Sequence, residues 1–462
     1  MVYVFGMTFP EIYSSVLSMY QQTATAGVWK YLEKQAGLHL RQGIYTPVVV
    51  FWLMMVQRLQ KNASQASVVQ QLALGAADPL LTDCKRVRER KIGLGTGSYC
   101  QARQKMPKLL VKQVSEEIQE RLRAQLSEPW PGLEQPVFLL DGSSLELEHC
   151  RELVKTYPPG NNGRVQGHWP ILRIVVMHDA RSGLAQPPFW GPMYGPEAVS
   201  EQALAEQAME QLSAGAVVMG DCNFGIFSIA YAAQQRQHPV VLRLTQARAY
   251  KLAGGPIGQR GEWEVVWKPS RWDKVKKTPW PAEATVPGRL IAKRVGRGKS
   301  KQWVYLFTTL KALAGEQTME LYGQRWPIET DLRSLKRTVR LHHIAAKTVD
   351  MMEKELLVAV SAYNLVRAVM CMAAKRAQLD PRQLSFSFVL TLVDCAWPRL
   401  MAARTEAEHD REFERLLDLA AGYKLPKRKK RRSYPRAVWG HGIQFPHRKA
   451  PPLKHARRSK TK

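Results

Sequence analysis

The sequence predicts a protein of the α/β class, with a helical region before its sheet and more helices after it. Two observations carry this prediction. Short apolar runs typical of buried strands alternate with helical segments between residues 131 and 244. Residues 1–126 instead show few strand-like alternations and are rich in Leu, Gln, Ala, Arg and Val, which favours helices. A chain of 462 residues is long enough for two or three domains.

The first region, residues 1–126, is predicted to be helical. Thr46 and Pro47 have the pattern of a helix start, with a threonine cap followed by proline in the first turn. The apolar run VVVFWLMMV that follows, residues 48–56, is too short to span a bilayer, so it predicts a buried helix. A further helical stretch extends from Ser98 to Leu126, with Pro107 as a break or a fresh start.

A catalytic α/β domain is predicted for residues 131–400. The segment PVFLLDGSSLEL gives a short apolar run that ends in Asp141, and ILRIVVMHDA gives a further strand. A helix beginning at Pro196 comes next, and the strand AGAVVMGD then ends in Asp221. The segment NFGIFSIAYAAQQRQ predicts another helix, and PVVLRL another strand. Strands and helices therefore alternate through this part of the chain.

A β-rich insertion is predicted within this domain, at about residues 245–303. The stretch is rich in Gly, Pro, Trp and Lys, and its short strand-like runs EWEVVWKP and RLIAKRVGRGKSKQW favour added strands over a second independent core. Tryptophans among cations suit base stacking and phosphate contact, although packing in the core is the commoner role of a tryptophan. The tryptophans of this stretch are Trp263, Trp267, Trp272, Trp280 and Trp303.

The charge of the chain points to a polyanionic partner. There are 68 Lys and Arg against 39 Asp and Glu, a net charge of +29, which favours nucleic acid first and an anionic membrane second. Residues 401–462 are expected to form a helix and a basic tail. From Lys424 to Lys462 the chain has 15 Lys or Arg and no Asp or Glu, so this tail should bind polyanions.

The cysteines and the N-terminus favour the cytoplasm. No basic-then-apolar leader with a small-residue cleavage site opens the sequence. The 6 cysteines form no Cys-x-x-Cys pair, which suits a reducing compartment better than a disulfide framework or a zinc site.

The most informative stretch is YGQRWPIETDLRSLK, residues 322–336. On one continuous helix its polar residues would share an arc of about 60°. A carboxylate flanked by two cations and a phenol could hold a metal ion and a phosphate together. The alternative is a solvated face with an ion pair between residues four apart. Pro327 favours a fresh helix start, which would put the carboxylate in a first turn. The four residues are Tyr322, Arg325, Glu329 and Lys336.

Two strand-end aspartates complete a candidate metal site. Asp141 and Asp221 each follow an apolar strand, and ligands of α/β sheets gather at the carboxyl ends of strands. With Glu329 they could form an oxygen-rich cluster of the kind that Mg²⁺ or Mn²⁺ prefers. Two such ions about 4 Å apart stabilise both oxygens of an in-line phosphoryl displacement. The alternative for each aspartate is a turn residue or a helix cap.

Two strand-end aspartates, followed by a Tyr-Arg-Glu-Lys stretch, resemble the DDE transposases of bacterial insertion sequences. They are most similar to the insertion-sequence-four group, whose signature is Tyr, two residues, Arg, three residues, Glu, six residues, Lys. The chain has this spacing at all four positions, after two strand-end aspartates. The segments SYCQARQKMP, Ser200-Glu201, LFTTL and Arg432–Arg436 are similar to the group as well, and the resemblance covers about residues 40–440.

The resemblance implies a ribonuclease-H-like catalytic domain interrupted by a β-rich insertion. It implies that the catalytic residues are the ligands of two Mg²⁺ or Mn²⁺ ions, namely Asp141, Asp221 and Glu329. It assigns contacts with the phosphates of the transposon end to Tyr322, Arg325 and Lys336. Trp303 is the nearest counterpart of a tryptophan that stacks on a base flipped out of the DNA end.

The function implied is cut-and-paste DNA transposition. Such an enzyme cleaves DNA at the inverted-repeat ends of its element and joins the freed 3′-hydroxyl to target DNA. A homodimer on the DNA ends, a bacterial cytoplasmic and nucleoid-associated location, and no membrane partner are expected with it. Two alternatives stay open: a domesticated DNA-binding protein without catalysis, and a nuclease without strand transfer. Three converging carboxylates argue against the first, while the second uses the same chemistry.

Overall fold

The structure is a computed structural model of the chain. It describes residue 34 and residues 43–425, apart from residues 61–63, 76, 82–83, 162–166, 271–280, 282, 297–300, 326–330, 336–340, 342–343 and 404. Glu329, Lys336, Trp272, Trp280 and the tail beyond residue 425 therefore lie outside the described residues.

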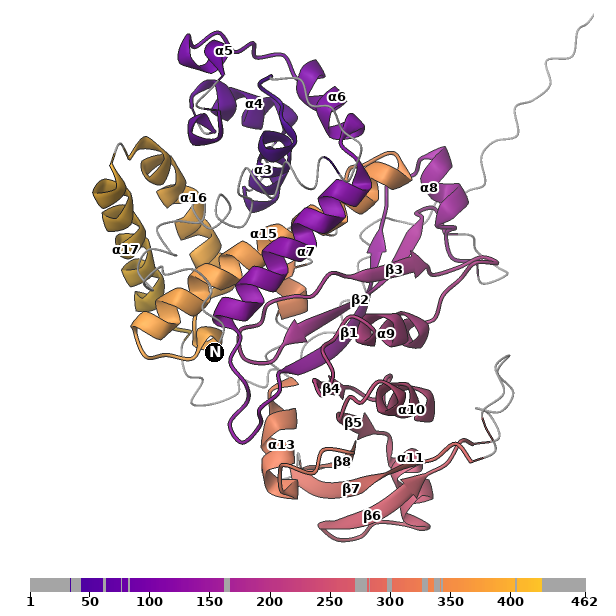
Figure 1. Ribbon diagram of the computed structural model, residues 1–462. Helices are drawn as coiled ribbons and strands as arrows, with labels where there is room; N and C mark the ends of the chain where they lie inside the picture. The colour runs from indigo at the N-terminus through magenta and orange to yellow at the C-terminus, as the bar shows by residue number, and fades with distance from the viewer. Residues whose placement is uncertain are drawn as a thin grey trace, which may run out of the picture.

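An eight-stranded sheet forms the centre of the described chain, in the order β3-β2-β1-β4-β5-β8-β7-β6 (Figure 1). β1 pairs antiparallel with β2, β2 pairs antiparallel with β3, and β4 and β5 continue the sheet parallel to β1. This order of five strands confirms the predicted α/β, ribonuclease-H-like fold. Their bounds are β1 Val137–Glu146, β2 Ile171–Asp179, β3 Phe189–Pro192, β4 Val217–Gly220 and β5 Val240–Leu244.

The β-rich insertion extends this same sheet. β8 (Gln302–Thr308) pairs antiparallel with β5, β7 (Val286–Val295) pairs with β8, and β6 (Gly261–Trp267) forms the edge. Because the sheet is continuous, the insertion shares one hydrogen-bonded ladder with the central strands.

Helices cover both faces of the sheet (Figure 1). On the first face, α9 (Glu201–Met209), α10 (Phe227–Gln235) and α11 (Gln246–Ala253) pack on residues such as Phe138, Val218 and Leu242. On the second face, α13 (Gly315–Gly323) packs on Leu139 and Met219. The second face also carries the largest core, which joins the β2 side chains to α7 (Lys108–Leu126) and α15 (Val349–Arg376).

α15 is the central helix of that largest core. By length and mean hydropathy it is the one described helix that could cross a membrane, yet its whole apolar window is buried inside the protein. It contacts α3 (Pro47–Leu59), α7, α16 (Phe386–Ala402) and α17 (Glu406–Gly422). These contacts account for its apolar sequence as that of a core helix.

The remaining described helices are short. They are α4 Gln65–Ala73, α5 Lys85–Arg88, α6 Gly97–Lys105, α8 Arg151–Thr156 and the 3₁₀ turns Asp78–Leu80 and Pro381–Gln383.

The predicted starts of two N-terminal helices are confirmed. The Thr46 side chain accepts a hydrogen bond from the Val49 amide, and Pro47 occupies the first turn of the buried helix α3. Pro107 caps α7, so this proline starts a helix and does not interrupt one.

Two predicted boundaries are wrong. β1 does not end at Asp141 but continues to Glu146, because its polar second half pairs with β2. The helix predicted from Pro196 begins only after Ser200, whose hydroxyl accepts a hydrogen bond from the Ala203 amide at 3.0 Å. α13 ends at Gly323, before the proline that favoured a fresh helix start, and residues 326–330 of the signature lie outside the described residues.

Candidate active site

Asp141 and Asp221 lie at the same level of two neighbouring strands. β1 and β4 are parallel, with Val137 beside Val217 and Leu139 beside Met219. Continuing this register by two residues brings Asp141 beside Asp221, the first residue after β4. Neighbouring strands lie about 4.8 Å apart, so the two aspartates start from adjacent backbone positions. The two carboxylates predicted to converge therefore start from neighbouring backbone positions, with Asp141 inside β1 and Asp221 just after the end of β4.

The two aspartates also face the same side of the sheet. Side chains alternate along a strand, so Asp141 shares its face with Leu139, and Asp221 follows the alternation of Met219. Both of those apolar residues pack in the core under α13, which also contains Tyr322. The pleat of two strands thus directs both aspartates toward the helix that carries the first residue of the signature.

The loop after Asp221 is held by backbone contacts. One carboxylate oxygen of Asp221 accepts a hydrogen bond from the Asn223 amide at 2.8 Å. Asp221 therefore also acts as a turn residue, the alternative that the sequence allowed for it. The Arg248 guanidinium, from α11, donates to the carbonyl oxygens of Cys222 at 2.7 Å and Gly225 at 3.1 Å. A Cβ at Gly225 would lie 1.9 Å from the Arg243 carbonyl oxygen, so only glycine lets the loop approach β5 this closely.

A further carboxylate, Glu201, lies beside the aspartates at the start of α9. Its side chain lies against Gly142, where an added Cβ would come within 1.6 Å of Oε1. Burial raises the pKa of Glu201, the charge of Asp221 raises it further, and Arg173 opposes both. Gly142 alternates with Asp141, so Glu201 approaches from the first face of the sheet, opposite α13.

Tyr322 lies on the aspartate face, at the end of α13. The residue is 8% exposed, and its hydroxyl is buried without a hydrogen-bond partner in the part of the chain that the structure describes. Burial raises the pKa of Tyr322 to about 12, while the charges of Arg325 and Arg243 lower it and those of Cys222 and Asp221 raise it. These interactions place the phenol between the Asp221 loop and two arginines.

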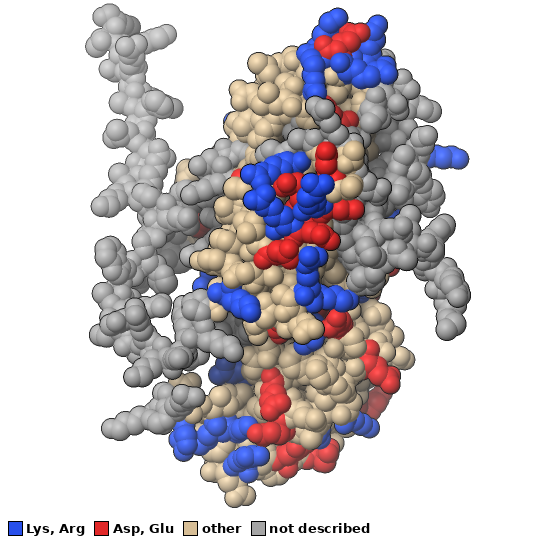
Figure 2. Space-filling view, turned by 90° about the vertical axis from the view of Figure 1, so that its left-hand side faces the viewer, with Lys and Arg blue, Asp and Glu red and all other residues tan. Residues whose placement is uncertain are grey.

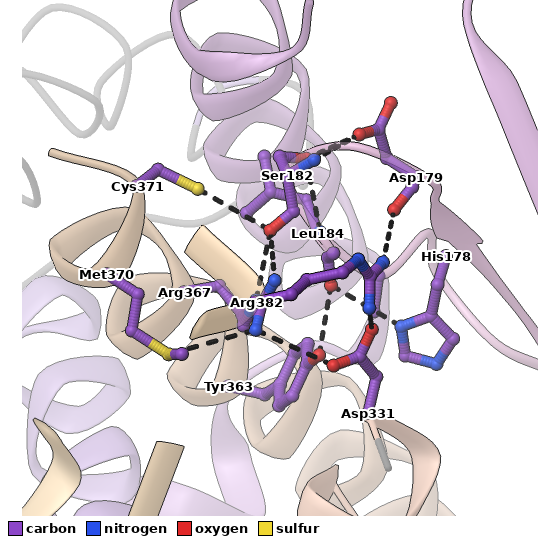
Figure 3. A network of polar contacts seen from close by, with 12 residues as sticks. His178, Asp179, Ser182, Leu184, Asp331, Tyr363, Arg367, Met370, Cys371 and Arg382 are labelled. Carbon is purple, nitrogen blue, oxygen red and sulfur yellow. Dashed lines mark hydrogen bonds and ion pairs between the residues drawn. The ribbon is translucent and has the colours of Figure 1, made fainter. Parts of the chain in front are cut away.

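The signature segment is anchored by a buried ion-pair network around Asp331 (Figure 3). Asp331 is 5% exposed and pairs with Arg382 and, at 3.5 Å, with Arg367 of α15. Arg382 also donates to the carbonyl oxygens of Asp179 and Ala180 at 3.1 Å each. The aspartate therefore ties its segment to the end of β2.

The same network fixes the turn that follows β2. The Arg367 Nε donates to the Ser182 carbonyl oxygen at 3.0 Å, and the Tyr363 hydroxyl donates to the Gly183 carbonyl oxygen at 2.9 Å. One oxygen of Asp179 accepts hydrogen bonds from the Ser182 amide and hydroxyl at 2.6 and 2.8 Å. Charges from three separate parts of the sequence are thus paired and bonded inside the fold.

Trp303 lies on the first face of the sheet, away from α13. It follows the alternation of Tyr305 and Phe307, which pack on that face, and its ring stacks on Tyr305 at 6.1 Å. The Arg294 guanidinium lies over the indole at 5.7 Å from the ring centroid. The stacking of Trp303 on a DNA base stays a prediction. Trp267 is 7% exposed and has the core role that is common for tryptophan.

The described part of the predicted metal site comprises Asp141 and Asp221. Carboxylate oxygens are the ligands that hard divalent cations prefer, so these two residues fit such an ion. Among the described residues no group of three His, Cys, Asp or Glu side chains is placed to hold a metal ion. The third predicted ligand, Glu329, falls within residues 326–330 and so outside the description. All six cysteines are free.

A site of two aligned, half-buried aspartates on a ribonuclease-H-like sheet, followed by the Tyr-Arg-Glu-Lys signature, defines a DNA transposase of the DDE class. The sequence model of the transposase DDE domain matches residues 132–365, and the chain belongs to this family. The chain is also similar to the transposase InsG for insertion sequence element IS4 of Escherichia coli (strain K12). The two are 25% identical over 365 residues, which cover 75% of this chain and 77% of InsG.

These comparisons confirm the predicted family, activity and class of enzyme. The protein is a transposase of the DDE class, and it acts on DNA. DDE transposases use divalent metal ions, in agreement with the two described carboxylates.

Sequence reasoning missed residues that depend on strand register or on burial. Arg243 sits inside the apolar run PVVLRL, where nothing in the sequence reveals which face it occupies. Asp331 lies inside the signature, where it reads as one more polar surface residue, although it is buried. The one signal of its burial in the sequence was that Asp331, two residues after Glu329, is followed by the apolar residues Leu332 and Leu335.

Proposed function

We propose that the protein excises its element by cutting DNA at the inverted-repeat ends and joins the freed 3′ ends to target DNA. The observation that carries this proposal is the shared level and shared face of Asp141 and Asp221, beside Tyr322. Asp141, Asp221 and Glu329 would ligate two Mg²⁺ or Mn²⁺ ions. When bound, such ions polarise phosphoryl oxygens and lower the pKa of a bound water.

The protein's own residues would position the DNA for two successive displacements. In the first, a water oxygen bonds to the phosphorus at the element end, and the 3′ oxygen leaves with a proton as a hydroxyl. In the second, this 3′-hydroxyl attacks a target phosphodiester, loses its proton and displaces a new 3′ oxygen. Tyr322, Arg325 and Lys336 would hold the flanking phosphates so that the attacking and leaving oxygens stay in line.

The partner would be double-stranded DNA, held in part by sequence-independent charge. Figure 2 shows Lys and Arg in several patches with Asp and Glu between them, over the side of the molecule that it presents. The chain's surplus of +29 includes the 15 cations of residues 424–462. Residues 1–126 would add contacts with the element's ends, the β-rich insertion would contact DNA through Trp303, and a homodimer would join two ends. The site of action would be the bacterial cytoplasm, at the nucleoid.

The test is an in vitro reaction with a supercoiled plasmid that carries the element's two inverted repeats. Purified protein with Mg²⁺ should release the segment between the repeats and, with a second plasmid present, insert it there. Excision without insertion would indicate a nuclease, and binding without cleavage would indicate a DNA-binding protein. Asp221→Asn serves as the control, because any cleavage that survives this substitution comes from a contaminating nuclease.

A further inference from the structure

A third charged residue lies in line with the two aspartates, on the next strand. β4 and β5 are parallel, with Met219 beside Val241 and Gly220 beside Leu242. Continuing this register by one residue brings Arg243 beside Asp221. Neighbouring strands lie about 4.8 Å apart. Asp141, Asp221 and Arg243 therefore form one row across three adjacent parallel strands.

Arg243 projects from the same face as the aspartates. It alternates with Leu242 and Leu244, which pack under the helices of the first face, and shares its side with Val241, which packs under α13. Its antiparallel partner Leu306 packs under α13 as well. Its charge acts on the Tyr322 hydroxyl, so the guanidinium and the phenol are neighbours.

Both donors of this pair lack an acceptor among the residues that the structure describes. In the part of the chain that the structure describes, the half-buried Arg243 guanidinium forms no hydrogen bond or ion pair, not even with Asp221. The Tyr322 hydroxyl is buried and is likewise without a partner there. Arginine keeps its charge at any pH of interest, and burying a charge or a hydroxyl without a partner is costly. The two donors thus form one site that a bound anion would satisfy.

We propose that Arg243 binds a non-bridging oxygen of a DNA phosphate next to the scissile one, together with the Tyr322 hydroxyl. This inference rests on the proposed function, because it takes the two aspartates as the site of cleavage. A guanidinium and a phenol are both donors, and arginine's planar fork matches the oxygens of a phosphate. Arg243 begins one strand away from Asp221, so it would hold the DNA strand beside the metal-binding carboxylates.

The experiment combines protein variants with single uncharged phosphates. Parent, Arg243→Ala and Arg243→Lys are compared in single-turnover cleavage at saturating protein, on a duplex carrying one element end. Each phosphate flanking the scissile bond is replaced in turn by a methylphosphonate, which lacks the negative charge. Arg236→Ala is the matched control, since Arg236 follows directly after α10 and pairs with Glu210 at the surface. Thermal unfolding of each variant checks that it is folded.

On native DNA, Arg243→Ala should cut about 10- to 100-fold more slowly than the parent, as expected for loss of a charged hydrogen bond. Arg243→Lys should recover part of that rate, and Arg236→Ala should match the parent. At one methylphosphonate position the cleavage rate of the parent should fall by a similar factor. On that same DNA, Arg243→Ala should cut no more slowly than the parent.

The proposal is overturned if Arg243→Ala cuts native DNA within about twofold of the parent. It is also overturned if, at every phosphate tested, the rate loss caused by Arg243→Ala and the rate loss caused by the methylphosphonate multiply with each other. Should the alanine variant fail to fold, the same comparison with Arg243→Lys decides, because an ammonium does not reproduce the two-point contact. Absence of cleavage by the parent would instead count against the proposed function, so the two failures are distinct.

Discussion

Arg382 forms a buried ion pair with Asp331 and at the same time donates to the main-chain carbonyls of Asp179 and Ala180. One arginine thus joins the signature segment to the strand beside β1. Because Arg367 contacts the other oxygen of Asp331, this carboxylate is the shared partner of two buried cations. The network gives the segment that follows Glu329 a fixed attachment to the sheet.

Asp331→Asn should destabilise the protein by about 3–5 kcal/mol, because it keeps the shape of the side chain and leaves two buried cations unneutralised. Urea unfolding at pH 7 measures this change. Glu89→Gln is the matched control, since Glu89 pairs with Lys85 at the surface and such a pair contributes about 0–1 kcal/mol. Equal midpoints for the two variants would contradict a stabilising role of the network.

The stability of the protein should fall as the pH is lowered from about 6.5 to about 4, in part through His178. The pKa of His178 is lowered to about 4, mainly by burial. The charges of Arg382 and Arg367 also lower this pKa, and the charge of Asp331 opposes them. As the pH falls, this histidine therefore takes up a proton in the unfolded chain before it does so in the folded protein. Its contribution to stability is complete above pH 6.5 and is lost as the pH falls toward 4. The whole effect would be roughly 3 kcal/mol.

The measurement is urea unfolding of parent and His178→Gln at several pH values. Whatever its stability at pH 7, the variant should lose less between pH 6.5 and 4 than the parent does. Parallel curves for parent and His178→Gln would rule out this origin.

Asp141→Asn should abolish cleavage while leaving binding to the element's ends largely intact. Removing a negative charge from the metal site weakens ion binding but does not weaken attraction to DNA. A gel-shift assay paired with Mg²⁺-dependent cleavage tests both halves. Asp418→Asn, on the exposed ion pair of α17, should behave as the parent in both assays. Full cleavage by Asp141→Asn would remove this aspartate from the active site.

Lys336→Ala should fold normally, bind DNA somewhat more weakly and cleave far more slowly. A misplacement of the reacting phosphate by about 1 Å costs on the order of 100-fold in rate. Lys336→Arg should rescue only in part, since a planar fork does not reproduce a compact point charge. Single-turnover cleavage at saturating protein separates rate from binding. An alanine variant that cuts at nearly the parent rate would make Lys336 an ordinary solvated lysine.

Deleting residues 424–462 should flatten the dependence of DNA affinity on salt. Each phosphate neutralised by the tail contributes about 0.9 to the slope of log affinity against log salt, through counterion release. The measurement is binding of specific and unrelated duplexes between low and physiological salt, and both should weaken alike. An unchanged slope would mean that the tail does not touch DNA.

The sequence predicted those parts of the fold and site that depend on local pattern. Asp141 and Asp221 were identifiable because each ends an apolar run, and Tyr322 because the spacing of the signature is regular. Strand alternation with helices was enough for the α/β class, and threonine before proline was enough to start α3.

What could not be predicted depends on partners distant in the sequence. The polar residues after Asp141 form strand only because β2 pairs with them, and no local pattern contains that pairing. Whether Arg243 faces the aspartates is decided by the register of β4 with β5. Asp331 reads as a surface residue until Arg367 and Arg382 are brought to it by the fold.

The burial of α15 has a consequence for the order in which this protein can be made. α3 and α7 lie near the start of the chain, yet the core that covers their apolar sides is completed by residues 349–376. A growing chain therefore exposes those sides until the ribosome has released Arg376, although domains synthesised first often fold first. Newly made protein can therefore complete the packing of its N-terminal helices only after the strands of the sheet have been made, so the N-terminal helices and the sheet mature together.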